Sequence, residues 1–549
     1  MPLIVKWVSA LEKVFVDEQP RDYPAHIPLS GLKGETQSFQ IALSLQPPAE
    51  WEHQLYLLQA DCALPLRVRL VDQVPVRFPC FSDTDAHYLR KAPGLYPDPL
   101  RDMAQGQPFR VYQGQWTGLW VDIEVPSDAQ PGDYSLQLQF SDQAGQPAGE
   151  LNVPFLVVDH ALPPQTLIQA RWLHADALAT YYNVPVFSDR HFEILESFIA
   201  LGARRGINMQ LIPIHTPPLD TRVGHERPTA QLVEVFVEAG GYRFQFDLLR
   251  RYIAMCQRAG VEYFEMAHLF TQWGAYHAPK IMGWRDGELV QLFGWQTDAT
   301  GPEYAGFLKA YLSALTQELR ALGVAEKCWF HISDEPGRQH IDQYLAAKAL
   351  VAPYLAGFPI MDALSDYAFY ENGAVAHPIP ALNHMDEFLK AKVPDLWTYY
   401  CVGQHKDVSN SFIAMPASRT RIIGMQLYQY ELKGFLQWAY NFYYSQYSDY
   451  ALNPWLITDA DGFAPAGDAF QVYPGSNGQP VESLRFMLFF QGLQDLRVLQ
   501  ALEAKAGREA TLKLLFEDLA QTPTLTDYPR QADWLLAMRW RVNQALAGA

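Results

Sequence analysis

Cysteine is scarce in this sequence, and basic residues form no cluster. The 549 residues include only five cysteines, which are dispersed and contain no Cys-x-x-Cys pair. Disulfide frameworks and structural zinc sites need paired cysteines, so we expect reduced thiols of the kind found in cytoplasmic proteins. Acidic residues outnumber basic ones by 60 to 42, which gives a formal net charge of −18. This charge, without any basic run, argues against a nucleic-acid partner.

Motifs that bind metals, nucleotides or acyl substrates are also missing. The fifteen histidines contain no His-x-x-x-His or His-Glu-x-x-His spacing and do not cluster with cysteines. No Gly-x-Gly-x-x-Gly or Walker loop opens a helix after a strand, and no Gly-x-Ser-x-Gly elbow occurs. We therefore predict no metal ion and no cofactor.

Long apolar runs are absent as well. No stretch reaches the roughly 20 apolar residues that a membrane-spanning helix needs. The N-terminus, Met-Pro-Leu-Ile-Val-Lys-Trp, has no uninterrupted apolar segment before Glu12 and no small-residue cleavage site. The sequence predicts a cytoplasmic protein with no membrane partner, and it contains no signal for an oligomeric state.

Aromatic residues, by contrast, are abundant. They make up 13% of the chain, with 14 Trp and 29 Tyr. Flat aromatic faces suit sugar rings, but they suit β-rich cores equally well. Composition alone leaves both interpretations open.

The stretch Lys327–Gly337, Lys-Cys-Trp-Phe-His-Ile-Ser-Asp-Glu-Pro-Gly, combines a buried-strand pattern with two adjacent acids. Its five residues from Cys328 to Ile332 are apolar or aromatic, as in strands buried on both faces. Pro336 cannot donate a ladder hydrogen bond, so the strand should end there. Asp334 and Glu335 are then held at the carboxyl end of a strand, where α/β barrels place their chemistry.

Two interpretations explain why such acids stand side by side. In the catalytic one, one acid keeps its proton at neutral pH while its neighbour ionises. In the structural one, Ser333, Asp334 and Glu335 cap a helix predicted at His340–Leu355. The buried strand in front and the aromatics around it favour catalysis.

Three segments differ in their pattern of hydrophobic residues. Short strands separated by Pro, Gly, Asp and Asn predict a β-sandwich domain over residues 1–162. About eight strands in a strand–helix rhythm predict a catalytic (β/α)8 barrel over 166–450. Residues 451–549 predict a mainly helical segment packed on the barrel. The fold class is therefore multidomain, α/β plus β.

The ends of the predicted barrel strands are rich in aromatic, amide and histidine side chains. Sugar rings need flat apolar faces together with directional polar partners, so we predict substrate-binding residues there. The alternative is that these side chains fill the barrel interior and that each histidine is a satisfied core group. The predicted binding residues are His174, His268, Gln272, Trp273, Tyr399, Trp438 and Asn441.

At Ser333-Asp-Glu-Pro336 the chain resembles the DUF4091 proteins, which are similar to glycoside hydrolase family 123. The similarity extends over most of the chain. Matching motifs in the first part are Leu11-Glu-Lys-Val14, Gly34-Glu-Thr-Gln-Ser-Phe-Gln40 and Tyr96-Pro-Asp-Pro-Leu100. Those in the later part are Trp397–Cys401, Trp438…Asn441, Asn453-Pro-Trp455, Gly467-Asp468, Tyr473-Pro-Gly475 and Ser483-Leu-Arg485…Gly492…Asp495.

The resemblance implies an exo-acting β-N-acetylgalactosaminidase that retains configuration through the substrate's own 2-acetamido group, an exception to the usual two-carboxylate scheme. By carry-over, Asp334 orients the acetamido N–H, and Glu335 is the general acid and then the base. Trp438 would be a sugar platform, with Tyr399 and Asn441 as polar contacts. The implied partner is a small carbohydrate substrate. Two alternatives stay open: the same mechanism on another β-N-acetylhexosaminide, and a non-catalytic carbohydrate-binding protein.

Overall fold

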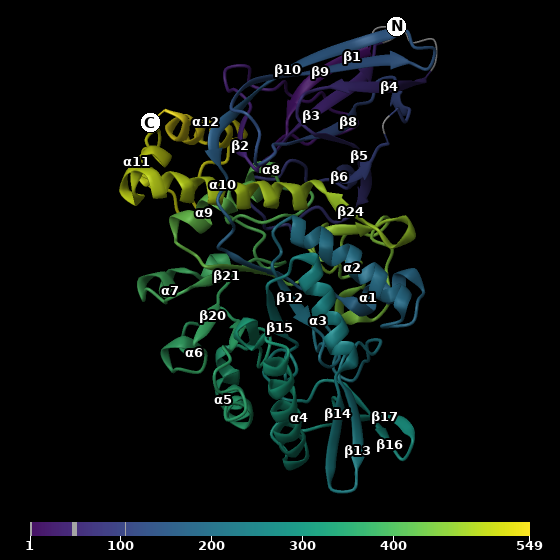
Figure 1. Cartoon of the computed structure of the whole chain (residues 1–549), viewed down its shortest axis with the longest axis vertical. Helices are drawn as coiled ribbons and strands as arrows, with labels where there is room; N and C mark the ends of the chain where they lie inside the picture. Colours follow the sequence, from purple (N-terminus) through teal and green to yellow (C-terminus); the bar gives the residue numbers. More distant parts are fainter. Residues whose placement is uncertain (1–2, 47–51, 105, 549) are drawn as a thin grey trace.

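The computed structural model describes residues 3–46, 52–104 and 106–548 (Figure 1). Strands of the N-terminal third lie at the top of this view, and the teal and green α/β part lies below them. The N-terminal strands are β1 (Leu3–Ser9), β2 (Ser30–Lys33), β3 (Thr36–Leu45), β4 (His53–Asp61), β5 (Leu66–Val76), β6 (Gly94–Asp102), β7 (Phe109–Tyr112), β8 (Thr117–Glu124), β9 (Gly132–Asp142) and β10 (Pro147–Ala161).

These strands form two sheets with an apolar core between them. The five-stranded sheet has the order β2-β10-β9-β4-β7, and the seven-stranded one has the order β1-β3-β8-β5-β6-β24-β23. On β9, Leu136, Leu138 and Phe140 are buried and alternate with exposed residues, as expected for a strand with one face on a core. They share one cluster with Phe39 and Val121 of the larger sheet.

Two late strands complete the larger sheet. They are β23 (Val472–Pro474) and β24 (Pro480–Ser483), and Glu482 of β24 pairs with Leu100 of β6. The larger sheet therefore contains strands from both ends of the chain, and the predicted boundary at 162 stays a prediction.

Eight parallel strands form the centre of the α/β part. Six make one sheet of order β18-β15-β12-β11-β22-β21, and β19 and β20 make a second, two-stranded sheet. Their bounds are β11 (Ile168–Arg171), β12 (Met209–Ile212), β15 (Tyr263–Met266), β18 (Cys328–Phe330), β19 (Met361–Ala363), β20 (His377–Ile379), β21 (Trp397–Tyr399) and β22 (Gly434–Gln437).

The predicted mixed α/β fold is confirmed. However, the eight strands form two separate sheets, each part of a barrel, and not the single closed (β/α)8 barrel that was predicted. Between the two sheets, β-pairing in the described residues is limited to the isolated bridges Phe330–Ile360 and Ala381–Tyr399. Strand length explains the gaps. Strands β18, β19, β20 and β21 have only three residues each, too few for a continuous hydrogen-bond ladder from one sheet to the other.

Helices and a small sheet surround these strands. The helices up to residue 429 are α1 (Ala175–Tyr182), α2 (Asp189–Arg204), α3 (Asp247–Ala259), α4 (Pro302–Ala321), α5 (Ile341–Val351), α6 (Ala368–Glu371), α7 (Asp386–Lys390), α8 (Ala417–Arg421) and α9 (Ile423–Gln429). The small sheet contains β13 (Glu234–Glu238), β14 (Gly241–Gln245), β16 (Ile281–Arg285) and β17 (Glu288–Phe293).

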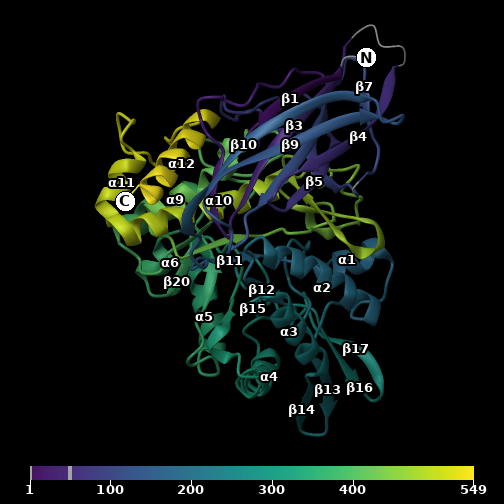
Figure 2. The same cartoon turned by 45° about the horizontal axis from the view of Figure 1, so that its top comes forward.

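The closing helices are α10 (Leu484–Ala506), α11 (Arg508–Leu515) and α12 (Ala532–Ala547). Helix α10 is buried on nearly all sides from Leu484 to Leu496, as expected for a helix in the middle of a large core. It contacts β6 and β24 on one side and α8 and α9 on another, and both views place it between the N-terminal sheets and the α/β part (Figures 1 and 2). Within the described ranges, no helix has the length and apolarity needed to cross a membrane.

Candidate active site

A cavity with about 580 Å³ of empty space, part of it open to solvent, lies where the central strands end. Six of the nine predicted site residues line it: Gln272, Trp273, Asp334, Glu335, Tyr399 and Trp438. The other lining residues are Trp172, Leu219, Asp220, Ala363, Cys401, Val402, Leu436 and Phe463. The cavity wall is thus mainly aromatic and aliphatic, with three carboxyl groups.

The acid pair lies on a backbone turn held by the end of β19 and by the loop that follows β15. Strand β18 ends at Phe330, earlier than predicted, and Glu335 has a φ of +44°. This left-handed conformation is uncommon for a residue with a side chain, and it costs of the order of 1–3 kcal/mol. The Glu335 N–H donates to the Ala363 carbonyl at 3.0 Å, and the Asp334 carbonyl accepts from the Trp273 N–H at 2.8 Å.

The helix-capping interpretation of this turn is wrong. Helix α5 begins at Ile341, and its N-cap residue is His340 rather than an acid. The Ser333 hydroxyl instead donates to the Thr271 carbonyl at 2.8 Å. The acids are therefore free to face the cavity.

Both acids hold their protons more tightly than ordinary carboxyls. Burial, and after it the charge of Glu335, raises the pKa of Asp334 well above its usual value. Burial also raises the pKa of Glu335, although the Tyr399 hydroxyl, which donates to Glu335 Oε1 at 2.5 Å, opposes that shift. Two acids that interact in this way release their protons in two steps, so over a range of pH one is protonated while the other is an anion. It can therefore supply an acid and an anion together.

Two tryptophans of the wall are oriented by buried carboxylates. The Trp172 indole N–H donates to Glu265 Oε2, and the Trp438 indole N–H donates to Asp468 Oδ2, both at 3.1 Å. Trp273 differs, because 40% of its surface is exposed, so it forms the open rim of the cavity.

His174 and Asn441 lie behind the wall rather than on it. Asn441 follows the end of β22 by four residues, and its amide bonds both the N–H and the carbonyl of His174 at 3.0 Å. The Arg227 guanidinium can only donate to His174 Nδ1 (3.1 Å), so Nε2 carries the proton that is donated to the Trp438 carbonyl at 3.1 Å. These residues support the backbone of Trp438.

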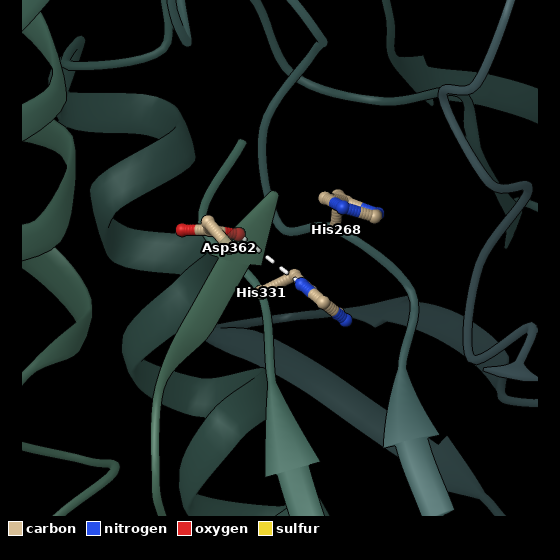
Figure 3. Close-up of side chains that lie close together, drawn as sticks. All are labelled: His268, His331 and Asp362. Carbon is tan, nitrogen blue, oxygen red and sulfur yellow. Dashed lines mark hydrogen bonds and ion pairs between the residues drawn. The ribbon is translucent and has the colours of Figure 1, made fainter. Parts of the chain in front are cut away.

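His268 is also fully buried, and it lies beside His331 and Asp362 (Figure 3). The three side chains are close enough to be considered as metal ligands. However, His331 Nδ1 lies 3.2 Å from Asp362 and Nε2 lies 3.0 Å from Glu265, so both ring nitrogens face carboxylates. A metal needs a free ring lone pair, which this geometry does not leave. The cluster therefore fits an ion-pair network better than a metal site.

The family model for "Glycoside hydrolase 123, catalytic domain" matches residues 172–502, which is more than half of the chain and includes the acid pair. The chain belongs to glycoside hydrolase family 123. The family resemblance and the prediction of an enzyme are confirmed, and the non-catalytic alternative is set aside.

A solved structure shares the fold of this family 123 enzyme. A family 123 glycoside hydrolase from Clostridium perfringens, described for glycolipid glycan hydrolysis, is 13% identical with a TM-score of 0.75, over 99% of this chain and 98% of the other. A family 5 mannosidase from Rhizomucor miehei is 12% identical over 61% of this chain and 94% of its own, with a TM-score of only 0.37. A search of curated proteins gave no significant match.

Two carboxyl groups near the cavity of this glycoside hydrolase escaped the predictions from sequence. Asp220 lies in the loop after β12, where its N–H donates to Gln272 Oε1 at 2.6 Å and its Oδ2 accepts from the Tyr447 N–H at 3.0 Å. Burial raises its pKa to about 6. Burial likewise raises the pKa of Asp468 to about 7. Asp468 belongs to a family motif, which was a usable signal, whereas nothing local marks Asp220.

We expect the kcat/KM of this family 123 enzyme to follow a bell-shaped pH profile displaced upward. At low pH both acids are protonated and no anion is available, and at high pH both are ionised and no proton donor remains. Because both pKa values are raised, both limbs should lie above the ordinary carboxyl value of about 4. The measurement is kcat/KM for an aryl glycoside across the pH range in which the protein stays folded. An acid limb at about 4 would contradict this expectation.

Proposed function

We propose that this enzyme is an exo-acting β-N-acetylgalactosaminidase that retains configuration by substrate assistance. The observation that supports this most is the adjacency of Asp334 and Glu335 on one turn that lines the cavity. Two acids one residue apart are poorly placed to lie on opposite sides of a glycosidic bond as nucleophile and acid, which retaining enzymes with a protein nucleophile require. A substrate that supplies its own nucleophile removes that requirement.

In the first step, the carbonyl oxygen of the 2-acetamido group attacks the anomeric carbon. Glu335 protonates the leaving oxygen as the glycosidic bond breaks, and a cyclic oxazolinium forms. Asp334 accepts a hydrogen bond from the acetamido N–H and offsets the positive charge that develops there. In the second step, Glu335 takes a proton from a water molecule that attacks the same carbon, and the ring reopens.

The sugar would be held by the cavity residues. Trp438 offers a flat face whose orientation is maintained by Asp468, and Tyr399 and Gln272 offer polar groups. Trp273 at the rim would contact the leaving group. The eight central strands would act together as a (β/α)8 barrel that presents these residues at its carboxyl face.

The proposed enzyme would be cytoplasmic. The five cysteines of the chain are free thiols, as is usual in a reducing compartment.

The deciding experiment compares three aryl glycosides that differ only in the sugar. We expect turnover of the β-N-acetylgalactosaminide, slower turnover of the β-N-acetylglucosaminide, and none of the analogue with a free 2-amine. NMR of the first-formed product should show the β-anomer. Equal rates for the first two sugars would support a broader β-N-acetylhexosaminidase, and an α-anomer product would exclude a retaining mechanism.

A further inference from the structure

We propose that His331 is a permanently charged positioning residue, which orients the cavity wall through Glu265 and places a positive charge that favours the anionic form of Asp334. This inference rests on the proposed role of Asp334. His331 stands three residues before Asp334 on the same segment and is fully buried.

The charge of His331 follows from its two partners. Nδ1 lies 3.2 Å from Asp362 Oδ1, and Nε2 lies 3.0 Å from Glu265 Oε2. A neutral imidazole carries one N–H, so its other nitrogen would point a lone pair at a carboxylate oxygen. With both nitrogens protonated, each donates to an anion. Burial lowers the pKa of His331, but the hydrogen bonds to Asp362 and Glu265 outweigh it and raise the pKa to about 9.

Both carboxylates have further hydrogen-bond donors that hold them in place. Asp362 Oδ2 accepts from the Tyr344 hydroxyl at 2.5 Å, and the Ile332 N–H lies 3.1 Å from Oδ1. Glu265 Oε2 accepts from the Trp172 indole N–H at 3.1 Å. Because Trp172 lines the cavity, the chain of contacts Asp362–His331–Glu265–Trp172 links the buried charge to the wall that a sugar would touch.

The neighbourhood of Asp334 explains why a positive charge matters there. Besides burial, Glu335, Asp362 and Asp220 all raise the pKa of Asp334, and His331 opposes them. In the proposed mechanism Asp334 must be the anion while Glu335 keeps the proton. A cation placed on the Asp334 side of the pair favours that distribution.

His268 completes the arrangement. Its ring stacks on the ring of His331, with centroids 4.2 Å apart and an interplanar angle of 22° (Figure 3). Burial lowers the pKa of His268 well below its usual value, so it is the neutral member of the stack. A second positive charge at this distance would repel the first. His268, which was predicted as a sugar contact, therefore covers the cation with an uncharged ring.

Two neutral variants test the proposal through the pH profile. His331→Asn keeps a donor near Asp362, and His331→Gln keeps one near Glu265. In both we expect the acid limb of kcat/KM to move up by about one pH unit or more, with kcat reduced about 10–100-fold and KM changed less. His215→Gln is the matched control, because His215 is buried, burial lowers its pKa to about 4, and its side chain hydrogen-bonds, among the described residues, only to the His268 carbonyl. It should leave the limb in place.

A direct measurement on the native enzyme keeps the test independent of variant folding. In protein with ¹⁵N-labelled histidine, one ring should remain doubly protonated at about pH 8, where ordinary histidines are neutral. A native spectrum without that signal, or variants with an unmoved acid limb, would overturn the proposal. If no hexosaminide is cleaved at all, the proposed function fails, while the NMR result still decides the charge of His331.

Discussion

Replacing Glu335 by glutamine should lower kcat/KM by about 10²–10⁴-fold on substrates with poor leaving groups, the usual scale for losing a general acid. The amide keeps the shape of the side chain, and its carbonyl oxygen can still accept from the Tyr399 hydroxyl that now contacts Oε1. What disappears is the proton that the leaving oxygen needs. The measurement is steady-state kinetics on a disaccharide or alkyl glycoside.

The leaving group provides the control for this variant. Aryl groups with a low pKa depart with little protonation, so the loss on them should be much smaller. Equal losses on both substrate types would mean that Glu335 is not the proton donor. Folding raises the pKa of Glu335, so ionising this group costs the native state stability as the pH rises, whereas glutamine cannot ionise. Thermal melting at neutral pH should therefore show a variant at least as stable as the native enzyme.

Asp334→Asn should reduce kcat by a similarly large factor while changing KM less. The variant keeps the shape and a hydrogen-bonding oxygen, but it lacks the negative charge that faces the cyclising intermediate. Positive charge develops only on the way to the transition state, so the loss should fall on the chemical step. The variant should also fold, because burial and the charge of Glu335 disfavour the ionised form of the native Asp334 and raise its pKa, and an asparagine carries no charge.

A stable thiazoline mimic of the intermediate separates this role from simple substrate binding. It should inhibit the native enzyme and bind the Asp334→Asn variant more weakly. An enzyme that ignores the thiazoline, or cleaves substrates without the 2-acetamido group equally well, would need a protein nucleophile. Substrate assistance would then fail at its central step.

The catalytic pair could be predicted because its signal is local. A run of apolar residues ending in Asp334 and Glu335 is visible in a short window, and strand burial follows from that window alone. Tyr399 and Trp438 were found by the same logic, since they stand at or directly after the ends of β21 and β22. Residues at strand ends gather at one face of an α/β fold, whatever the rest of the chain does.

The strand-end signal could not say which side chains reach the cavity. His174, His268 and Asn441 carry it as clearly as Tyr399, yet they lie behind the wall. Side-chain direction there depends on partners such as Arg227, which lies 53 residues from His174. Closure of the barrel was also undecidable, because it depends on how many residues of β18 to β21 find a partner on the next strand.

Local sequence patterns thus determined the class of fold, the family and the position of the two acids, because each depends on neighbouring residues or on short motifs. The tertiary structure decided the cavity and its charges. Asp220 enters the site through contacts with Gln272 and with Tyr447, 227 residues away. His331 is charged because Glu265 and Asp362, from two other strands, meet it on opposite sides. Such contacts arise only when distant segments pack, and burial then gives them their electrostatic strength.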